Sequence, residues 1–121
     1  MIELIKSFRD LRVYQQSYAL TLRIYQTARQ FPREELFGLT SQIKRAAYSI
    51  PLNIAEGYGK KQSLSEFKRF LSMAIGSCDE MSVILDLVKD LGFINEILYN
   101  ELQNAYTEIG KMLSKMYKEW I

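Results

Sequence analysis

The chain has 121 residues, of which 48% are hydrophobic and 25% are charged, so it can form one domain with a buried core, and disordered, collagen-like and disulfide-rich classes are excluded. It contains no histidine and a single cysteine, which excludes Ser-His and Cys-His catalytic pairs, histidine metal sites and internal disulfides. The formal net charge is +2, but residues 41–69 carry six basic residues against two acids, and residues 79–108 carry seven acids against one lysine, which predicts one positive and one negative region.

Hydrophobic residues at helical spacing predict a first helix after Asp10. This helix should end near Gln30, because Pro32 disfavours helical geometry at the residue before it. The predicted core face of this helix consists of Leu11, Tyr14, Tyr18, Leu22, Tyr25 and Ala28.

A second helix is predicted from Leu36 to Gly59, with a proline inside it. Pro51 removes one backbone hydrogen bond and crowds the carbonyl of Ala47, at a cost of roughly 3 kcal/mol in an unadapted helix. The hydrophobic spacing nevertheless stays in phase on both sides of the proline, so we expect one kinked helix. Its predicted core face consists of Leu36, Leu39, Ile43, Ala47, Ile50, Ile54 and Tyr58.

The third predicted helix begins at a capping box in which the Ser63 hydroxyl accepts from the Glu66 amide and the Glu66 carboxylate reaches back. It should end at Gly92. Cys78 falls on the core face and is expected to act as a small hydrophobic residue. That face consists of Phe67, Phe70, Ala74, Cys78, Met81, Leu85 and Val88.

The fourth predicted helix runs from a cap at Asn95 to the end of the chain and has more apolar surface than one bundle helix usually buries. Its core residues are Leu98, Leu102, Ala105, Ile109, Met112 and Met116. A second row consists of Tyr99, Tyr106, Leu113, Trp120 and the adjacent Tyr117, and the second helix has a similar flank with Tyr48 and Leu52. These rows are either partly solvent-exposed edges of the core or an interface between copies of the chain.

Four helices with short connections predict an all-α fold, an antiparallel up-and-down four-helix bundle that forms a single domain over residues 1–121. The first six residues include charges, and no run of about 18 apolar residues occurs anywhere. We therefore expect a cytoplasmic protein with no signal peptide and no membrane contact.

The strongest candidate site is a basic cluster where the second helix meets the third. Lys60 and Lys61 end one helix, and Lys68 and Arg69 lie in the first turns of the next. Such a cluster can bind phosphates through counterion release, or it can be an ordinary solvated turn. Arg45 and Glu56 share a helix face and are expected to form at most a surface ion pair.

Three stretches of the sequence resemble the bacterial four-helix-bundle family named for proteins encoded in intervening sequences of 23S rRNA genes. They are QIKRAAYSIPLNIAEGYGKK (residues 42–61), FKRFLSMAIGSCDE (67–80) and FRDLRVYQQSYAL (8–20). The most specific piece is the in-phase Pro51 followed by Asn53 and Glu56-Gly57. Lys60 stands where many relatives have arginine, which keeps the charge but loses the bidentate geometry.

The resemblance implies a small cytoplasmic protein without enzymatic activity that assembles as a homo-pentamer. Related accessory proteins of diversity-generating retroelements bind RNA and a reverse transcriptase through a positive surface. The implied binding positions in this sequence are Lys44, Arg45, Lys60, Lys61, Lys68 and Arg69.

Two functional hypotheses follow. The first is a non-catalytic, oligomeric scaffold whose basic cluster contacts RNA. The second is a protein-interaction module whose acidic residues 79–108 and aromatic row recruit a basic protein partner. An enzyme would require Glu56, Arg45 and Tyr58 to converge in one pocket, but Tyr58 is on the predicted core face of the helix and the other two are on the opposite side. No metal or cofactor is expected.

Overall fold

A computed structural model describes residues 4–120 of the chain. Within that range the protein forms four α-helices, two short 3-10 helices and no strand. The α-helices are α1 (Arg12–Ala28), α2 (Leu39–Gly59), α3 (Leu64–Asp90) and α4 (Glu96–Glu119). The 3-10 helices are η1 (Phe8–Asp10), which precedes α1, and η2 (Arg33–Glu35), which follows it.

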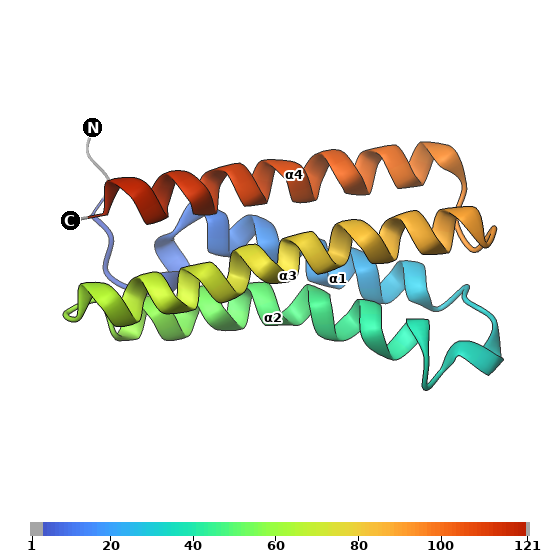
Figure 1. The fold of residues 1–121 in the computed structure, drawn as a ribbon, viewed down its shortest axis with the longest axis horizontal. Helices are drawn as coiled ribbons and strands as arrows, with labels where there is room; N and C mark the ends of the chain where they lie inside the picture. The colour runs from blue at the N-terminus through green and yellow to red at the C-terminus, as the bar shows by residue number, and fades with distance from the viewer. Residues whose placement is uncertain (1–3, 121) are drawn as a thin grey trace.

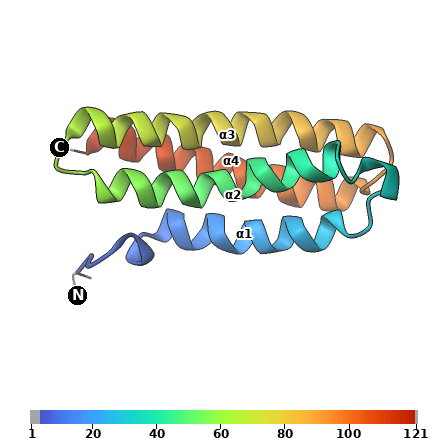
Figure 2. The same ribbon diagram turned by 90° about the horizontal axis from the view of Figure 1, so that it is seen from below.

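Consecutive α-helices run in opposite directions along a shared long axis (Figures 1 and 2), with α2 between α1 and α3, and α4 against α3 and α1. This arrangement confirms the predicted all-helical fold of four helices. The start of α1, the α2–α3 turn and the end of α4 lie at the same end of the bundle (Figure 1). No helix within residues 4–120 is both long and apolar enough to span a membrane.

The helix ends of α3 and α4 follow their sequence signals closely. Asn95 caps α4, since its Oδ1 accepts from the Leu98 amide at 2.8 Å. Gly92 ends α3 with a positive φ of 80°, and its amide donates to the Lys89 carbonyl at 2.9 Å. The next amide, that of Phe93, donates back into the last turn of α3, which completes a Schellman motif.

Only half of the predicted capping box forms at the start of α3. The Ser63 hydroxyl accepts from the Glu66 amide at 3.4 Å, as predicted. The Glu66 carboxylate bonds the Arg69 guanidinium instead of returning to the Ser63 backbone. The charged donor is the stronger partner for a carboxylate, so it displaces the reciprocal bond.

α2 begins three residues later than predicted. Residues 33–35 form η2, and Leu36 lies outside α2 with an exposed side chain, so it is not part of the core face. The Glu35 carboxylate accepts from the Leu39 amide at 3.1 Å and so satisfies one of the donors left free at the start of α2.

α2 runs without a break through Pro51, which confirms that this segment is one helix. The proline leaves the Ala47 carbonyl without its usual backbone donor. Thr21 of α1 supplies part of a substitute, because its hydroxyl lies 2.8 Å from the Ser17 carbonyl oxygen and 3.2 Å from that of Ala47 and shares one proton between them. A residue on the neighbouring helix therefore partly compensates the proline.

The core face of α1 differs from the predicted one. Val13 and Ile24 are buried, whereas Tyr18, Leu22 and Tyr25 lie on the outer surface, with Leu22 56% exposed. The buried residues and the exposed residues both recur at helical spacing. The β-branched residues pack closely inside the bundle, while the larger tyrosines keep their hydroxyl groups in water. The prediction was correct for Leu11 and Ala28, which are buried, and wrong for Tyr18, Leu22 and Tyr25, which form an apolar outer surface on α1.

Part of the second row on α4 also belongs to the core. Tyr106 is 2% exposed and Leu113 is fully buried, so neither can contribute to the predicted interface between copies. Trp120 is partly buried and packs on Phe67 with ring centroids 4.6 Å apart. The bundle thus covers by itself much of the row that was a candidate interface between copies.

Candidate nucleic-acid interface

Three separate parts of the chain, each rich in basic residues, meet at the end of the bundle that holds the α2–α3 turn, because α1 begins there and α4 ends there (Figure 1). We call this the basic end and define it as residues 6–12, 56–69 and 111–119. It has ten basic residues against four acids, Asp10, Glu56, Glu66 and Glu119. The ten are Lys6, Arg9, Arg12, Lys60, Lys61, Lys68, Arg69, Lys111, Lys115 and Lys118.

Several cations of the predicted cluster lie against aromatic rings. Lys60 Nζ lies 5.8 Å and the Arg69 guanidinium 4.4 Å from the centroid of the Phe70 ring. Lys61 Nζ lies 4.0 Å from the centroid of the Tyr58 ring. Cation–π contacts of this kind hold a charge at a fixed place without neutralising it.

The cations supplied by α4 extend this surface. Lys68 Nζ of α3 lies 4.9 Å from the centroid of the Tyr117 ring of α4, which joins the two helices. Lys111, Lys115 and Lys118 are exposed and form no ion pair or ring contact within residues 4–120. Their charges are therefore available to an anionic ligand.

Glu66 is the acid inside the predicted cluster. Its carboxylate accepts from Arg69 Nε at 2.8 Å and from a second guanidinium nitrogen at 3.3 Å. The bond lowers the pKa of Glu66 and raises the pKa of Arg69. Arg69 is thus paired with an acid of its own helix, whereas Lys60, Lys61 and Lys68 form no ion pair within residues 4–120.

Lys44 and Arg45 do not lie with the other predicted binding residues. Sixteen positions of α2 separate Lys44 from Lys60, which is about 24 Å at 1.5 Å per residue. Lys44 Nζ lies 5.0 Å from the centroid of the Tyr25 ring. The six predicted residues therefore occupy two places on the molecule, and four of them belong to the basic end.

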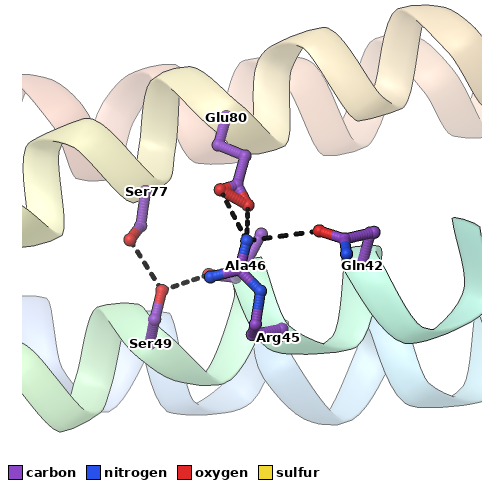
Figure 3. A network of polar contacts seen from close by, with 6 residues as sticks. All are labelled: Gln42, Arg45, Ala46, Ser49, Ser77 and Glu80. Carbon is purple, nitrogen blue, oxygen red and sulfur yellow. Dashed lines mark hydrogen bonds and ion pairs between the residues drawn. The ribbon is translucent and has the colours of Figure 1, made fainter.

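Arg45 is held by a polar network between α2 and α3 (Figure 3). Its guanidinium lies 2.6 Å and 3.1 Å from the two oxygens of Glu80, and 3.2 Å from the Gln42 side-chain oxygen. Ser49 and Ser77 continue the network, with their hydroxyl oxygens 2.7 Å apart. Arg45 thus joins two helices, and its partner is Glu80, whereas the predicted partner was Glu56.

Acidic residues of the negative region are largely bonded within the chain. Glu80 and Glu101 pair with Arg45 and Arg23, and Asp90 lies 3.5 Å from the ammonium group of Lys89. Asp86 accepts from the Tyr99 hydroxyl at 2.5 Å and from the Gln103 side-chain amide at 3.1 Å. That this region recruits a basic protein stays a prediction.

An apolar groove of about 450 Å³ lies between the outer faces of α1 and α2. It includes Tyr48 and Leu52, two of the predicted interface residues, and the exposed residues of α1 that were expected in the core. Its main lining residues are Tyr14, Tyr18, Leu22, Tyr25, Tyr48 and Leu52. The predicted interface residues Tyr99, Tyr117 and Trp120 lie on α4 or at its end, outside this groove.

A family model described as 23S rRNA-intervening sequence protein matches residues 9–115. The chain belongs to this family. A similar solved structure is that of a protein with unknown function from the S23 ribosomal protein family of Bacteroides thetaiotaomicron VPI-5482. It has 29% sequence identity and a TM-score of 0.80, over 88% of this chain and 95% of that chain. No curated protein matches this chain.

In this member of the 23S rRNA-intervening sequence protein family, the motif of residues 49–57 serves helix packing. The Asn53 side-chain amide donates to the Ser49 carbonyl at 2.8 Å. A Cβ at Gly57 would lie 3.0 Å from the Phe70 Cβ, so glycine permits the close approach of α2 and α3. The motif positions the α2–α3 turn and thereby the basic end.

The residues that could have formed a catalytic site are apart. The Tyr58 side chain is buried, Glu56 is exposed and Arg45 bonds Glu80. Cys78 is buried, as predicted, and burial raises the pKa of its thiol to about 12. Within residues 4–120 no group of three or more Cys, Asp or Glu side chains is placed to hold a metal ion. The similar solved structure is likewise described as one of unknown function.

Proposed function

We propose that this protein is a non-catalytic, oligomeric RNA-associated scaffold that contacts backbone phosphates with its basic end. The observation that carries the proposal is the sorting of charge along the bundle. A chain with a net charge of only +2 has ten basic residues against four acids at one end. A positive surface of this kind attracts polyanions at a distance and binds them by counterion release.

The side chains at the basic end suit a phosphate backbone better than a particular base sequence. Lysines supply most of the charge, and lysine acts as a point charge without the two-pronged geometry of arginine. Of the three arginines at this end, Arg69 is bonded to Glu66. The scaffold should therefore bind RNA with little sequence preference, which matches phosphate contact.

Self-association is the second part of the proposal, with five copies around one axis as the arrangement that we expect. The groove between α1 and α2 supports it, because an exposed face rich in tyrosine and leucine is typical of an interface between copies. A ring would bring several basic ends close to one RNA, and weak contacts would then gain from multivalency.

RNA affinity of charge-reversal variants tests the first part. Lys60→Glu combined with Lys61→Glu should weaken binding of a single-stranded RNA at least thirtyfold, roughly 2 kcal/mol. The matched control is Arg29→Glu combined with Arg33→Glu, which makes the same charge change at the opposite end and should alter affinity less than threefold. Equal losses in both variants would show that only total charge matters and would reject a specific basic end.

Solution mass tests the second part. The chain mass is 14.2 kDa, so a pentamer has a mass of about 71 kDa by light scattering. Leu52→Glu should dissociate it, because Leu52 is 53% exposed and lies in the groove. Ile97→Glu, at a residue that is 73% exposed outside the groove, should not. A wild-type mass near 14 kDa, or dissociation by both variants, would contradict this interface.

A further inference from the structure

A second groove, of about 560 Å³, lies between α3 and α4. It exists because small residues of the two helices face each other there. Cys78 and Ser82 lie on α3, and Gly110 and Ser114 lie on α4. A Cβ at Gly110 would meet no atom within 4 Å, which shows open space above the helix. Its volume is within the range of small-molecule sites.

Tyr106 lines this groove and is the most unusual residue in it. Its side chain is 2% exposed, yet its hydroxyl has no hydrogen-bond partner within residues 4–120. Leaving a buried hydroxyl without a partner costs about 1–3 kcal/mol. Phenylalanine would fill the same space without that cost. A bound molecule that reached this hydroxyl would remove that cost.

The rim of the groove is cationic. Lys111, Lys115 and Lys118 follow one another at spacings of four and three residues, so they share one face of α4. Asp79 and Glu119 are the acids among the lining residues, which leaves one net positive charge. The lysines form no ion pair within residues 4–120, and the groove thus joins a cationic rim to a floor of mixed polar and apolar residues.

We propose that this groove binds a small organic phosphate of nucleotide size. The phosphate group would lie among the three lysines, and the rest of the molecule would lie between Cys78 and Gly110 and bond the Tyr106 hydroxyl. The site does not depend on the proposed RNA scaffold. The same chemistry is present in a free mononucleotide and in one nucleotide of a bound RNA strand.

Calorimetric titration of the full-length protein tests the site, with the four 5′-mononucleotides and inorganic phosphate as probes. At least one mononucleotide should bind the wild type more tightly than inorganic phosphate does. Gly110→Leu should fill the groove and reduce that affinity more than tenfold. The matched control is Gly76→Leu, at another helical glycine with open space, which does not line the groove. It should leave the affinity unchanged.

Tyr106→Phe separates a ligand role from a structural one. The variant should bind the same mononucleotide about three- to tenfold more weakly, the effect of one hydrogen bond. Its melting temperature without ligand should be equal to that of the wild type or higher. Unchanged affinity together with a lower melting temperature would show that the hydroxyl serves the fold and would overturn the proposal.

Competition with single-stranded RNA shows whether the groove binds a free organic phosphate or one nucleotide of an RNA strand. If RNA displaces the mononucleotide and Gly110→Leu weakens RNA binding, the groove takes a nucleotide of the strand. If RNA binding is insensitive to Gly110→Leu while mononucleotide binding is lost, the ligand is a free organic phosphate. The proposal is overturned if none of the four mononucleotides binds at about 10 mM, or if inorganic phosphate binds as tightly as they do.

Discussion

At the end of the bundle that holds the α3–α4 connection, several charged side chains have polar partners within the chain. Arg23 pairs with Glu101, and the Asp86 carboxylate accepts from two side chains of α4. At the basic end, Lys61 lies on the Tyr58 ring, where an aromatic face takes the place of an acid. An ion pair uses a charge within the fold, whereas a ring positions a charge and leaves it available to a ligand.

The difference shows why charge counted along the sequence is a poor guide to a binding surface. Arg45 falls within the positive stretch of the sequence, but Glu80 neutralises it in the structure. Lys115 and Lys118 lie far along the chain from that stretch and belong to the basic end. What decides availability is the partner of each charge, which only the packing of the helices reveals.

The largest expected effect comes from two basic residues at the N-terminal side of the basic end, Arg9 of η1 and Arg12 of α1. Arg9→Glu combined with Arg12→Glu should weaken RNA binding about thirtyfold or more, because reversing two charges removes contacts and adds repulsion. Arg29→Glu with Arg33→Glu, at the other end of α1, is the control and should change affinity less than threefold. Filter binding at fixed salt measures both. If Arg9→Glu with Arg12→Glu does not weaken binding more than the control does, these two residues are not part of the RNA surface.

Packing at the basic end gives the next largest effect. Gly57→Ala should lower the free energy of unfolding by about 1–3 kcal/mol, because its methyl group would lie against Phe70. Gly59→Ala is the matched control, since its Cβ would meet no atom within 4 Å. It should be neutral or stabilise α2 by up to about 1 kcal/mol. Urea unfolding measures both variants, and a stabilising Gly57→Ala would contradict the close approach of α2 and α3.

Glu66 offers a smaller effect in the opposite direction. Glu66→Gln releases Arg69 and should raise RNA affinity about threefold at neutral pH. The pKa of Glu66 is lowered by Arg69, so its contribution to stability is present above its ordinary value of 4.5 and is lost as the pH falls through the lowered value. The wild type should therefore be more stable than Glu66→Gln at pH 7, and acid should remove this difference. A difference that persists in strong acid would argue against the pair.

The smallest effect is expected at Arg45. Arg45→Ala should leave RNA affinity within twofold of the wild type, because Glu80 already neutralises the guanidinium. Unfolding free energy should fall by at most about 1 kcal/mol, as is usual for an exposed ion pair. A tenfold loss of RNA affinity would place this residue on the RNA surface, as the sequence alone had suggested.

The helix ends at the α3–α4 connection were predictable because each depends on a few neighbouring residues. Gly92 and Asn95 mark the α3–α4 connection by local chemistry alone, and both signals were correct. The buried face of α1 was not predictable in the same way. Its true core face includes Ser17 and Thr27, two polar residues that a search for hydrophobic spacing passes over. The Ser17 hydroxyl donates to the Tyr14 carbonyl, so it can be buried without a partner on another helix.

The candidate site was partly predictable for a related reason. The four basic residues at the α2–α3 turn are close in sequence, so their proximity followed from the turn. The contributions of α1 and α4 depend on topology. An up-and-down bundle places the start of its first helix and the end of its last beside the second turn, and this signal could have located Arg12 and Lys118.

The salt dependence of RNA binding tests the central claim most directly. The logarithm of the affinity should fall with the logarithm of salt concentration with a slope of about −3 or steeper, at about 0.7 per phosphate contact on a single strand. Lys60→Glu with Lys61→Glu should make the slope shallower by about 1.4, two contacts. A flat dependence for the wild type, or a slope unchanged in the variant, would contradict binding of RNA phosphates by the basic end.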